Sequence, residues 1–324
     1  MESPIRFEEF MHRALHDPIH GYYAKRIHDI GRRGDFTTAP VISSMPARAI
    51  ARWATAAMRE SGCRDLIEIG PGKGTLAAAV LKHLPWHIRW KIRLHLVETS
   101  EPLTRLQRDT LGSKARWHRS PAEALAACDG RAVIFSNELV DAFPVRRFQN
   151  TADGWQELMV SMPLDRDATE HLEKISTLPP SSSFHQNHPL GQWIEVHESY
   201  RRWLEEWMPN WQAGRMLTID YGSTADQLYH RRPTGTLRGY HFQQLIEGPE
   251  IYRHPGQRDL TADVNFTDLV EWSAPWTEDS RLQTFANFLS SHADPRDESD
   301  RYLLDDFGAG TAFMVLDQSC KKSA

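Results

Sequence analysis

The chain has 324 residues, more than most single domains, and 40% of them are hydrophobic, so it can bury a sizeable core. Its formal net charge of −5 argues against a dedicated DNA- or RNA-binding protein, although Arg-rich stretches leave room for a local basic patch. No apolar run is long enough to cross a bilayer, and the three widely spaced cysteines fit neither a disulfide framework nor a zinc ribbon.

The N-terminal segment predicts a short amphipathic helix. Apolar residues recur at helical spacing through residues 7–15, and Pro18 disfavours the α conformation at the residue before it, so we expect the helix to end near position 17. This break interrupts the ladder formed by His12, His16 and His20. We therefore interpret these histidines as ordinary surface or capping residues rather than metal ligands.

A glycine-flanked loop at residues 31–40 contains Asp35 and Thr38, and a helix is expected after it through residues 47–58. Loops of this kind can close over a ligand as a lid. A simple structural turn is an equally good interpretation of the loop.

The middle of the chain alternates short apolar runs with helical patterns, which predicts a doubly wound parallel sheet with helices on both faces. A late strand at 311–316 is expected to complete it. The expected parallel strands are residues 65–70, 93–98, 115–118, 132–137 and 216–221.

Two regions break this alternation. Residues 145–196 contain strand-like pieces at 155–160 and 193–196, joined by a Pro/Ser/His-rich link, and the second region lies between residues 221 and 317. We predict four parts: an N-terminal helical extension with the lid (1–60), a Rossmann-like core (61–144), an inserted subdomain with β and helical elements on the substrate side (145–210), and the remainder of the core with insertions (211–324).

The most informative stretch is the glycine-rich turn Gly70-Pro71-Gly72-Lys73-Gly74, which follows a buried strand carrying Glu68. Glycines let a ligand approach backbone N–H groups, and the helix that follows adds the positive end of its dipole. The glycines alternate, which differs from the G-x-G-x-x-G fingerprint of nicotinamide cofactors. Taken alone, the triplet could also be only a tight strand-to-helix connection.

A carboxylate ends the next strand, at Glu98. Doubly wound folds place the acceptor for ribose hydroxyls at the end of this strand, so Glu98 is the predicted ribose ligand.

Several separate motifs together resemble the MidA-like methyltransferases, a family that includes the mitochondrial protein arginine methyltransferase needed for assembly of respiratory complex I. The likeness runs from about residue 5 to the C-terminus, and its motifs at 137–145 and 259–266 are far more specific than the glycines alone. The motifs are Gly21-Tyr22-Tyr23, residues 34–40, residues 68–76, residues 97–100, Asn137-Glu138-Leu139-Val140-Asp141-Ala142-Phe143-Pro144-Val145, Ile219-Asp220-Tyr221-Gly222 and Asp259-Leu260-Thr261-Ala262-Asp263-Val264-Asn265-Phe266.

The resemblance implies a class I fold, a Rossmann-like α/β methyltransferase sheet, and S-adenosyl-L-methionine as cofactor. The chain departs from the family pattern after Pro40, where it has Val41 and then Met45-Pro46-Ala47 in place of an acidic residue and a Phe-Gly pair. A methyl acceptor different from that of the family therefore stays open. The implied cofactor-binding residues are Glu68, Gly70, Pro71, Gly72, Gly74, Glu98, Thr99, Asp35, Thr38 and Asn137.

The candidate catalytic residues are Asn137, Glu138 and Asp141, which follow the carboxyl end of a predicted strand, where open α/β sheets bind ligands. Their spacing on a helical turn would put Glu138 and Asp141 on one face. An arginine acceptor calls for carboxylates, since two unit charges about 4 Å apart repel by roughly 4 kcal/mol at a dielectric of about 20. Alternatively, Asp141 caps the following turn and Glu138 bonds only to backbone.

Three further groups of residues in the second half of the chain have more than one interpretation. Asp220 could line the acceptor side of the sheet edge. Asp259 and Thr261 could instead form an N-cap arrangement for a helix through residues 266–269. The tryptophans Trp203, Trp207 and Trp211 could form a partner surface, but i, i+4 spacing is more often found in a core.

The leading hypothesis is a methyltransferase that uses S-adenosylmethionine and modifies an arginine of a protein, in the cytoplasm of a bacterial-type cell. The protein substrate is implied by the resemblance alone. Neither membrane insertion nor nucleic-acid binding is expected, and the chain could form a homodimer. Alternatives are a small-molecule methyltransferase, a non-catalytic assembly chaperone that binds the same cofactor, and a nicotinamide oxidoreductase, which the alternating glycines disfavour.

Overall fold

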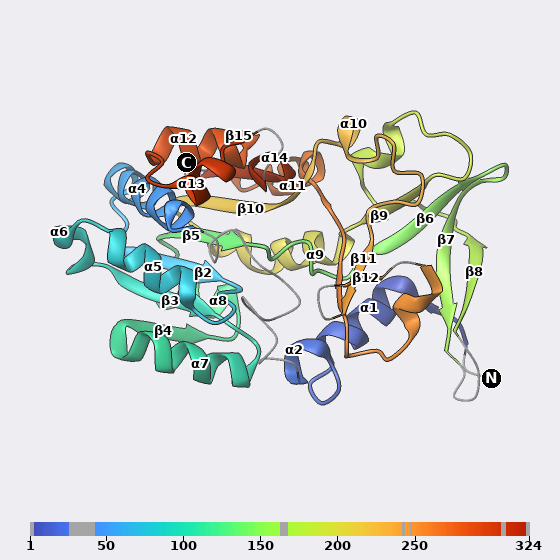
Figure 1. Ribbon diagram of the computed structural model, residues 1–324, viewed down its shortest axis with the longest axis horizontal. Coiled ribbons are helices and arrows are strands. Elements are labelled where there is room, and N and C mark those ends of the chain that lie inside the picture. Colours follow the sequence, from blue (N-terminus) through green and yellow to red (C-terminus); the bar gives the residue numbers. More distant parts are fainter. Residues whose placement is uncertain are drawn as a thin grey trace. The chain divides into compact units, whose positions relative to one another are not determined.

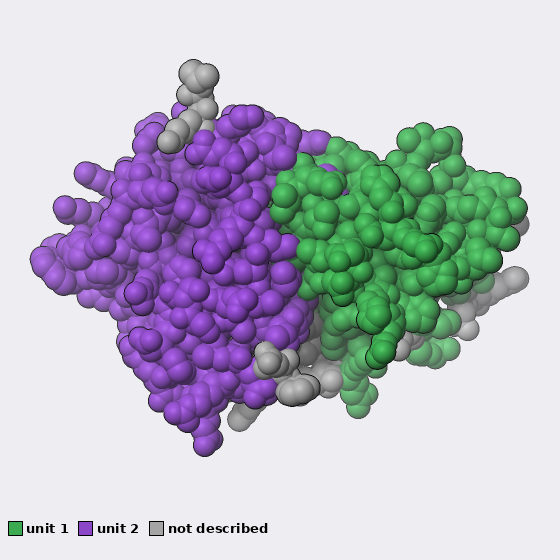
Figure 2. Space-filling view, turned by 90° about the horizontal axis from the view of Figure 1, so that it is seen from above, with its two compact units in different colours: residues 1–29, 140–203, 222–271 green, residues 30–139, 204–221, 272–324 purple. Residues whose placement is uncertain are grey.

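A computed structural model describes residues 3–25, 43–162, 168–241, 244–246, 248–305 and 309–321 (Figure 1). The chain forms two compact units (Figure 2): unit 1 comprises residues 1–29, 140–203 and 222–271, and unit 2 comprises residues 30–139, 204–221 and 272–324. Asp35 and Thr38 of the expected lid lie outside the described residues.

Unit 2 is built on a twisted sheet in the strand order β15-β16-β10-β5-β2-β3-β4 (Figure 1). The five strands from β10 to β4 are mutually parallel, whereas β16 is antiparallel to both of its neighbours, β10 and β15. All five predicted parallel strands are confirmed, and so is a late strand that completes the sheet. The bounds are β2 (Asp65–Ile69), β3 (Arg93–Val97), β4 (Ala115–His118), β5 (Ala132–Asn137), β10 (Arg215–Ser223), β15 (Thr277–Thr284) and β16 (Phe313–Cys320).

The last strand was expected at residues 311–316, and its start is wrong. Thr311 and Ala312 belong to the helical turn α14 (Ala309–Ala312), and the ladder with β10 begins where Phe313 pairs with Tyr221. The apolar run at 312–316 does not reveal where the helical turn ends and the strand begins, because apolar residues are compatible with both conformations.

Helices cover the sheet of unit 2 on both faces, as predicted (Figure 1). Helix α4 (Met45–Ser61) ends at Gly62, whose φ of 70° suits a glycine and whose N–H donates to the Met58 carbonyl oxygen. Together with α5 and α12, α4 forms the main apolar core. The remaining helices of unit 2 are α5 (Thr75–His83), α6 (Trp86–Arg89), α7 (Glu101–Leu111), α8 (Pro121–Ala126), α12 (Phe285–His292) and α13 (Glu298–Tyr302).

Unit 1 contains an antiparallel sheet in the order β1-β7-β6-β9, with β8 paired to β7, and a small sheet in the order β12-β11-β13. The predicted strands at 155–160 and 193–196 are confirmed within β7 and β9. The bounds are β1 (Ile5–Arg6), β6 (Arg146–Thr151), β7 (Gly154–Ser161), β8 (Thr169–Lys174), β9 (Trp193–Val196), β11 (Arg238–His241), β12 (Gln244–Ile246), β13 (Asp259–Thr261) and β14 (Val264–Asn265).

The first helix, α1 (Phe7–His16), ends at Asp17 as predicted and buries its apolar stripe against strands of unit 1. Trp207 and Trp211 are buried, which confirms the core interpretation for these two residues, whereas Trp203 is half-buried. The other helices that lie wholly or partly in unit 1 are α2 (Tyr22–Lys25), α9 (Glu198–Trp207), α10 (Ala225–Leu228) and α11 (Phe266–Ser273).

The expected N-cap at Asp259 and Thr261 is wrong, because both residues belong to strand β13. Asn265 performs this role for α11: its Oδ1 accepts hydrogen bonds from the N–H groups of Thr267 at 3.1 Å and Asp268 at 3.4 Å.

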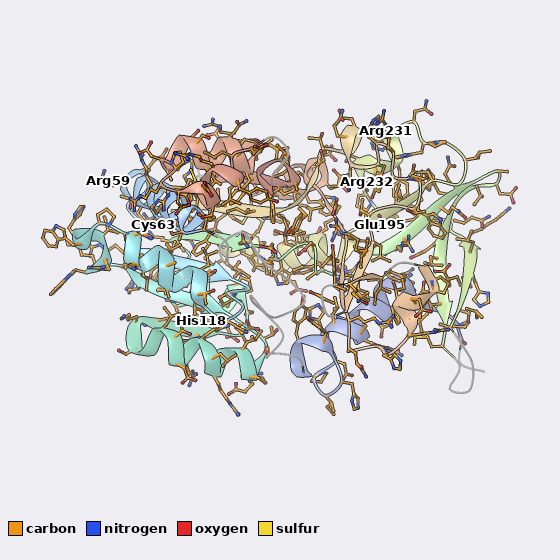
Figure 3. The ribbon with its side chains drawn as sticks, in the orientation of Figure 1. Arg59, Cys63, His118, Glu195, Arg231 and Arg232 are labelled. Atoms are coloured by element: carbon orange, nitrogen blue, oxygen red, sulfur yellow. The ribbon has the colours of Figure 1, made fainter. Side chains whose placement is uncertain are left out.

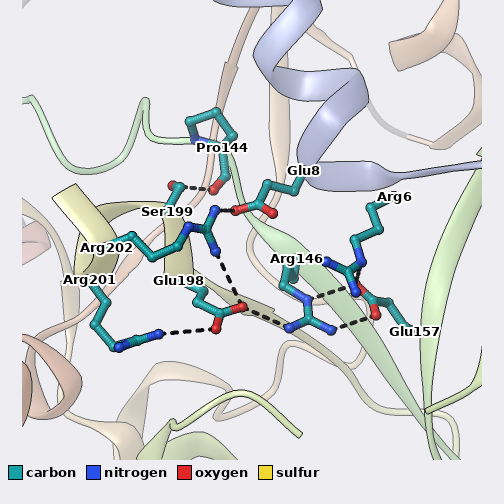
Figure 4. Close-up of polar contacts among 9 residues, drawn as sticks. All are labelled: Arg6, Glu8, Pro144, Arg146, Glu157, Glu198, Ser199, Arg201 and Arg202. Carbon is teal, nitrogen blue, oxygen red and sulfur yellow. Dashed lines mark hydrogen bonds and ion pairs between the residues drawn. The ribbon is translucent and has the colours of Figure 1, made fainter. Parts of the chain in front are cut away.

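Buried ion pairs hold the antiparallel sheet of unit 1 together. The Arg146 guanidinium donates to both oxygens of Glu157 at 2.7 and 2.6 Å and to Glu198 at 2.7 Å (Figure 4). Arg147 donates to Glu195 at 3.0 Å, and Glu195 also accepts the N–H of Thr236 at 2.8 Å; Glu195 is labelled in Figure 3.

Among the described residues, no helix combines the length and the apolar character that crossing a bilayer requires.

Candidate functional site

The glycine-rich turn lies at the carboxyl end of β2, in unit 2. Gly70, Gly72 and Gly74 have φ values of 67°, 52° and 76°, a region that L-residues with side chains avoid. A Cβ on Gly70 would come within 2.7 Å of the Leu139 side chain, whereas the space around Gly72 is open to 4 Å. Gly74 caps α5, and its N–H donates to the Pro71 carbonyl oxygen at 2.8 Å. The turn therefore presents bare backbone at the start of a helix.

Glu98 follows β3 at the same edge of the sheet, and the structure holds its carboxylate in place. One oxygen accepts the Ser100 N–H at 2.8 Å, and the other accepts the Gln107 amide at 3.1 Å. Burial raises the pKa of Glu98, and these hydrogen bonds oppose the rise. Thr99, beside it, is exposed.

Gln107 connects the glycine turn to this carboxylate. Its Nε2 also donates to the Gly72 carbonyl oxygen at 2.7 Å, and its Oε1 accepts the Trp117 indole N–H at 3.0 Å. The side chain is fully buried and packs beneath Gly74. Sequence reasoning missed Gln107, because a polar residue on the buried face of a helix carries no motif that identifies its partners.

Glu68 lies buried in β2 directly before the turn. Desolvation raises the pKa of Glu68 to about 8, and a hydrogen bond with the backbone of Ala77 partly opposes this rise. Its Oε2 has no hydrogen-bond partner in the part of the chain that the structure describes. A buried carboxyl oxygen without a partner is costly, so this position is unusual for a purely structural residue.

Asn137 is the last residue of β5, which pairs with β2, and Glu138 follows it. The Asn137 amide donates to the Glu138 carboxylate at 2.9 Å, and the buried Asn137 Oδ1 has no partner among the described residues. Glu138 has a φ of 53°, in the left-handed region that costs a non-glycine residue roughly 1–2 kcal/mol. Strain of this kind gathers at functional sites, where surrounding structure maintains it.

The expectation that a helical turn puts Glu138 and Asp141 on one face is wrong. The segment from 138 to 140 is not helical, and the left-handed conformation of Glu138 redirects the chain. Asp141 belongs to unit 1, where desolvation raises its pKa to about 7; the Arg238 guanidinium and backbone amides oppose this rise, and the Asp263 carboxylate adds to it. These amides are its own and that of Ala142, the next residue, whereas a capping side chain accepts from residues two or three further on.

Asp220, near the end of β10, secures this edge of the sheet. It is fully buried; one carboxylate oxygen accepts the Leu139 N–H at 3.1 Å and the other accepts the Tyr221 N–H at 2.9 Å. Asp220 thereby fixes the residue after Glu138, and Leu139 in turn packs against Gly70. Within unit 2, the Asp220–Leu139 hydrogen bond and the Leu139–Gly70 contact thus connect the ends of β10, β5 and β2.

These residues fit an adenosyl ligand. An open glycine turn suits close approach of a ligand to the backbone, and the Glu98 carboxylate keeps lone pairs for hydroxyl donors. Two buried oxygens, at Glu68 and Asn137, have no partner within the described ranges. Apart from Lys73 in the turn, the charged residues described at this edge are carboxylates, such as Glu68, Glu98 and Glu138, which favours a ligand with a positive charge over a diphosphate.

The parallel sheet with its antiparallel last strand, the glycine turn after β2 and the carboxylate after β3 define the class I S-adenosylmethionine-dependent methyltransferase fold. Residues 49–280 match the model of the family described as "Putative S-adenosyl-L-methionine-dependent methyltransferase". The chain belongs to this family, so the cofactor is S-adenosyl-L-methionine and the predicted resemblance is confirmed.

Curated relatives include "Protein arginine methyltransferase NDUFAF7, mitochondrial" of Rattus norvegicus, which is 30% identical over 82% of this chain, and that of Mus musculus, which is 29% identical over 82%. The match covers 66% of each relative's own length. A crystal structure of a Burkholderia thailandensis protein bound to S-adenosyl-homocysteine is 26% identical, with a TM-score of 0.84 over 98% of this chain and 88% of that chain.

Proposed function

We propose that the protein transfers the methyl group of S-adenosylmethionine to an arginine side chain of a protein substrate. The names of the relatives support the arginine acceptor, and the site supports the transfer. The observation that carries the proposal is the strained Glu138, with its carboxylate bonded to Asn137 at the end of β5. Leu139, the next residue, packs against the glycine turn.

The cofactor supplies a methyl group that its sulfonium already activates. In the proposed reaction a guanidinium nitrogen forms a bond to this methyl carbon as the carbon–sulfur bond breaks, and S-adenosylhomocysteine leaves. The Glu138 carboxylate orients the guanidinium, offsets its repulsion from the sulfonium and takes up the proton that the nitrogen loses. Asn137 keeps Glu138 oriented through the 2.9 Å hydrogen bond.

We assign cofactor binding to the glycine turn, Glu98 and Glu68. The glycines Gly70, Gly72 and Gly74 let the cofactor approach the backbone of the turn closely, together with Pro71. Glu98 accepts hydrogen bonds from its ribose hydroxyls, with Thr99 at its side. The same proposal includes closure by Asp35 and Thr38 and a second carboxylate role for Asp141 toward the acceptor. It places the reaction in the cytoplasm, on a protein partner.

The first test is calorimetric titration of the full chain with S-adenosylhomocysteine. The Glu98→Ala variant should bind roughly 10-fold more weakly, because a charge-assisted hydrogen bond contributes about 1.5–3 kcal/mol and water replaces part of it. Glu101→Ala, which removes an exposed carboxylate on α7, is the matched control and should bind like the wild type. Unchanged affinity in Glu98→Ala would remove the ribose assignment.

The second test follows a labelled methyl group into protein from a bacterial lysate, with methylarginine identified after hydrolysis. Glu138→Gln should lower turnover about 10²–10⁴-fold while leaving the affinity for S-adenosylhomocysteine unchanged. Normal turnover by Glu138→Gln contradicts the role of Glu138. Label recovered only in small molecules contradicts the arginine acceptor and favours the small-molecule alternative.

A further inference from the structure

An exposed aromatic and basic tip, defined here as Lys82, Trp86, Arg89, Trp90 and Lys91, lies around α6 at the outer end of unit 2 (Figure 1). Trp86 and Trp90 have exposed fractions of 71% and 83%, which is unusual for the largest apolar side chain. The backbone N–H of Trp90 donates to the Trp86 carbonyl oxygen at 3.1 Å, so the two residues are one helical turn apart and share one face of the helix.

The charge of this tip differs from that of the chain as a whole. The sequence contains no acidic residue between Glu68 and Glu98, although the chain carries a net charge of −5. Lys82, Arg89 and Lys91 are exposed and form no ion pair with the described residues. The pKa of the neighbouring His83 is lowered by partial burial and then by the cations Arg48, Arg296 and Lys82, which agrees with a positive local potential.

Two exposed indoles beside three unpaired cations are the composition of an interfacial membrane anchor. Trp rings prefer the headgroup level of a bilayer, where the apolar body is covered and the N–H stays hydrated. Stable attachment needs two signals, and the tip combines apolar area with attraction to anionic lipid. Because salt screens charges beyond about 8–10 Å, the negative charge elsewhere on the chain does not cancel this attraction.

A protein partner fits the α6 tip less well than a lipid surface does. Two tryptophans offer roughly 300–400 Å² of apolar surface, whereas a stable protein interface covers about 800 Å² on each side. A fluid lipid surface needs no shape complementarity and accepts a tip of this size. Nucleic acid is disfavoured as well, because three cations give only weak, strongly salt-dependent phosphate binding.

We propose that the α6 tip docks this protein on anionic lipid headgroups, with Trp86 and Trp90 inserted at the interface and Lys82, Arg89 and Lys91 contacting the lipid phosphates. This attachment is peripheral and independent of the proposed reaction, since none of its residues belongs to the glycine turn or to β5.

The test is co-sedimentation of the full chain with vesicles of phosphatidylcholine alone and of phosphatidylcholine mixed with phosphatidylglycerol. The wild type should bind the anionic vesicles at least about 10-fold more tightly than the neutral ones, and high salt should release it. Trp86→Ala with Trp90→Ala should weaken binding about 10-fold or more. Changing Lys82, Arg89 and Lys91 to Gln should weaken it roughly 100-fold, at about 5-fold per cation.

Leu190→Ala with Leu245→Ala is the matched control, because these leucines are 72% and 53% exposed in unit 1. This control should bind vesicles like the wild type, and all variants should retain the wild-type affinity for S-adenosylhomocysteine, which reports folding. The proposal is overturned if the wild type does not bind anionic vesicles, if either tip variant binds them like the wild type, or if a single-stranded RNA is bound more tightly than the vesicles.

Discussion

The central strands of the two units bury different kinds of residue. In unit 2, β5 buries Ala132 to Phe135 as a continuous apolar run, as expected for a strand covered by helices on both faces. In unit 1, β6 begins with Arg146 and Arg147, which are also buried and depend on carboxylates from other strands. At these two strands, unit 2 thus gains stability mainly from apolar area, whereas unit 1 depends on charges that must find exact partners.

The largest effect should come from breaking the ion pairs of unit 1. Arg146→Met removes the buried guanidinium that Glu157 and Glu198 share and leaves them only the more exposed cations of Arg6, Arg201 and Arg202. We expect the free energy of unfolding to fall by about 3–5 kcal/mol. Urea denaturation of the full chain measures this change. The double variant Arg146→Met with Glu157→Leu should recover part of the loss, because it also removes the most buried carboxylate.

Arg105→Met is the control, since Arg105 forms an exposed pair with Glu101 on α7. It should change stability by less than about 0.5 kcal/mol. If Arg146→Met resembles this control, unit 1 does not depend on its buried charges and the contrast between the units fails.

A second prediction concerns Glu68, a carboxyl group that unit 2 buries with one oxygen unpartnered. Its pKa of about 8 in the folded state exceeds the ordinary value of 4.5, so the unfolded chain releases this proton first as the pH rises. The free energy of unfolding should therefore fall between about pH 4.5 and pH 8, by up to about 1.4 kcal/mol per pH unit from this group.

Glu68→Gln should remove that slope and leave the folded state comparatively more stable near pH 8. Urea denaturation at several pH values across this window measures it, with Glu101→Gln as a control that keeps the wild-type slope. An unchanged slope in Glu68→Gln would show that the carboxyl group ionises in the folded protein without cost.

The same contrast explains what the sequence could predict. The five parallel strands and the glycine turn could be located because apolar runs and glycines act locally, within a few residues. Arg146 and Glu198 meet across 52 positions, and no local pattern pairs them. The left-handed φ of Glu138 and the strand at Asp259 also depend on tertiary contacts, which is why a helical turn and an N-cap were expected there instead.

The smallest effect should come from Gln107, the polar residue that the sequence did not single out. Gln107→Leu keeps the buried volume but removes the donor to Gly72 and Glu98 and leaves the Trp117 N–H without its acceptor. We expect a loss of about 1–3 kcal/mol in stability and roughly 5- to 10-fold weaker binding of S-adenosylhomocysteine, because the turn and the Glu98 carboxylate are no longer held together. Thermal unfolding and calorimetry measure both, with the exposed Gln227→Leu as control. A stability loss with unchanged affinity would mean that the glycine turn keeps its geometry without Gln107, so that backbone conformation alone positions the cofactor.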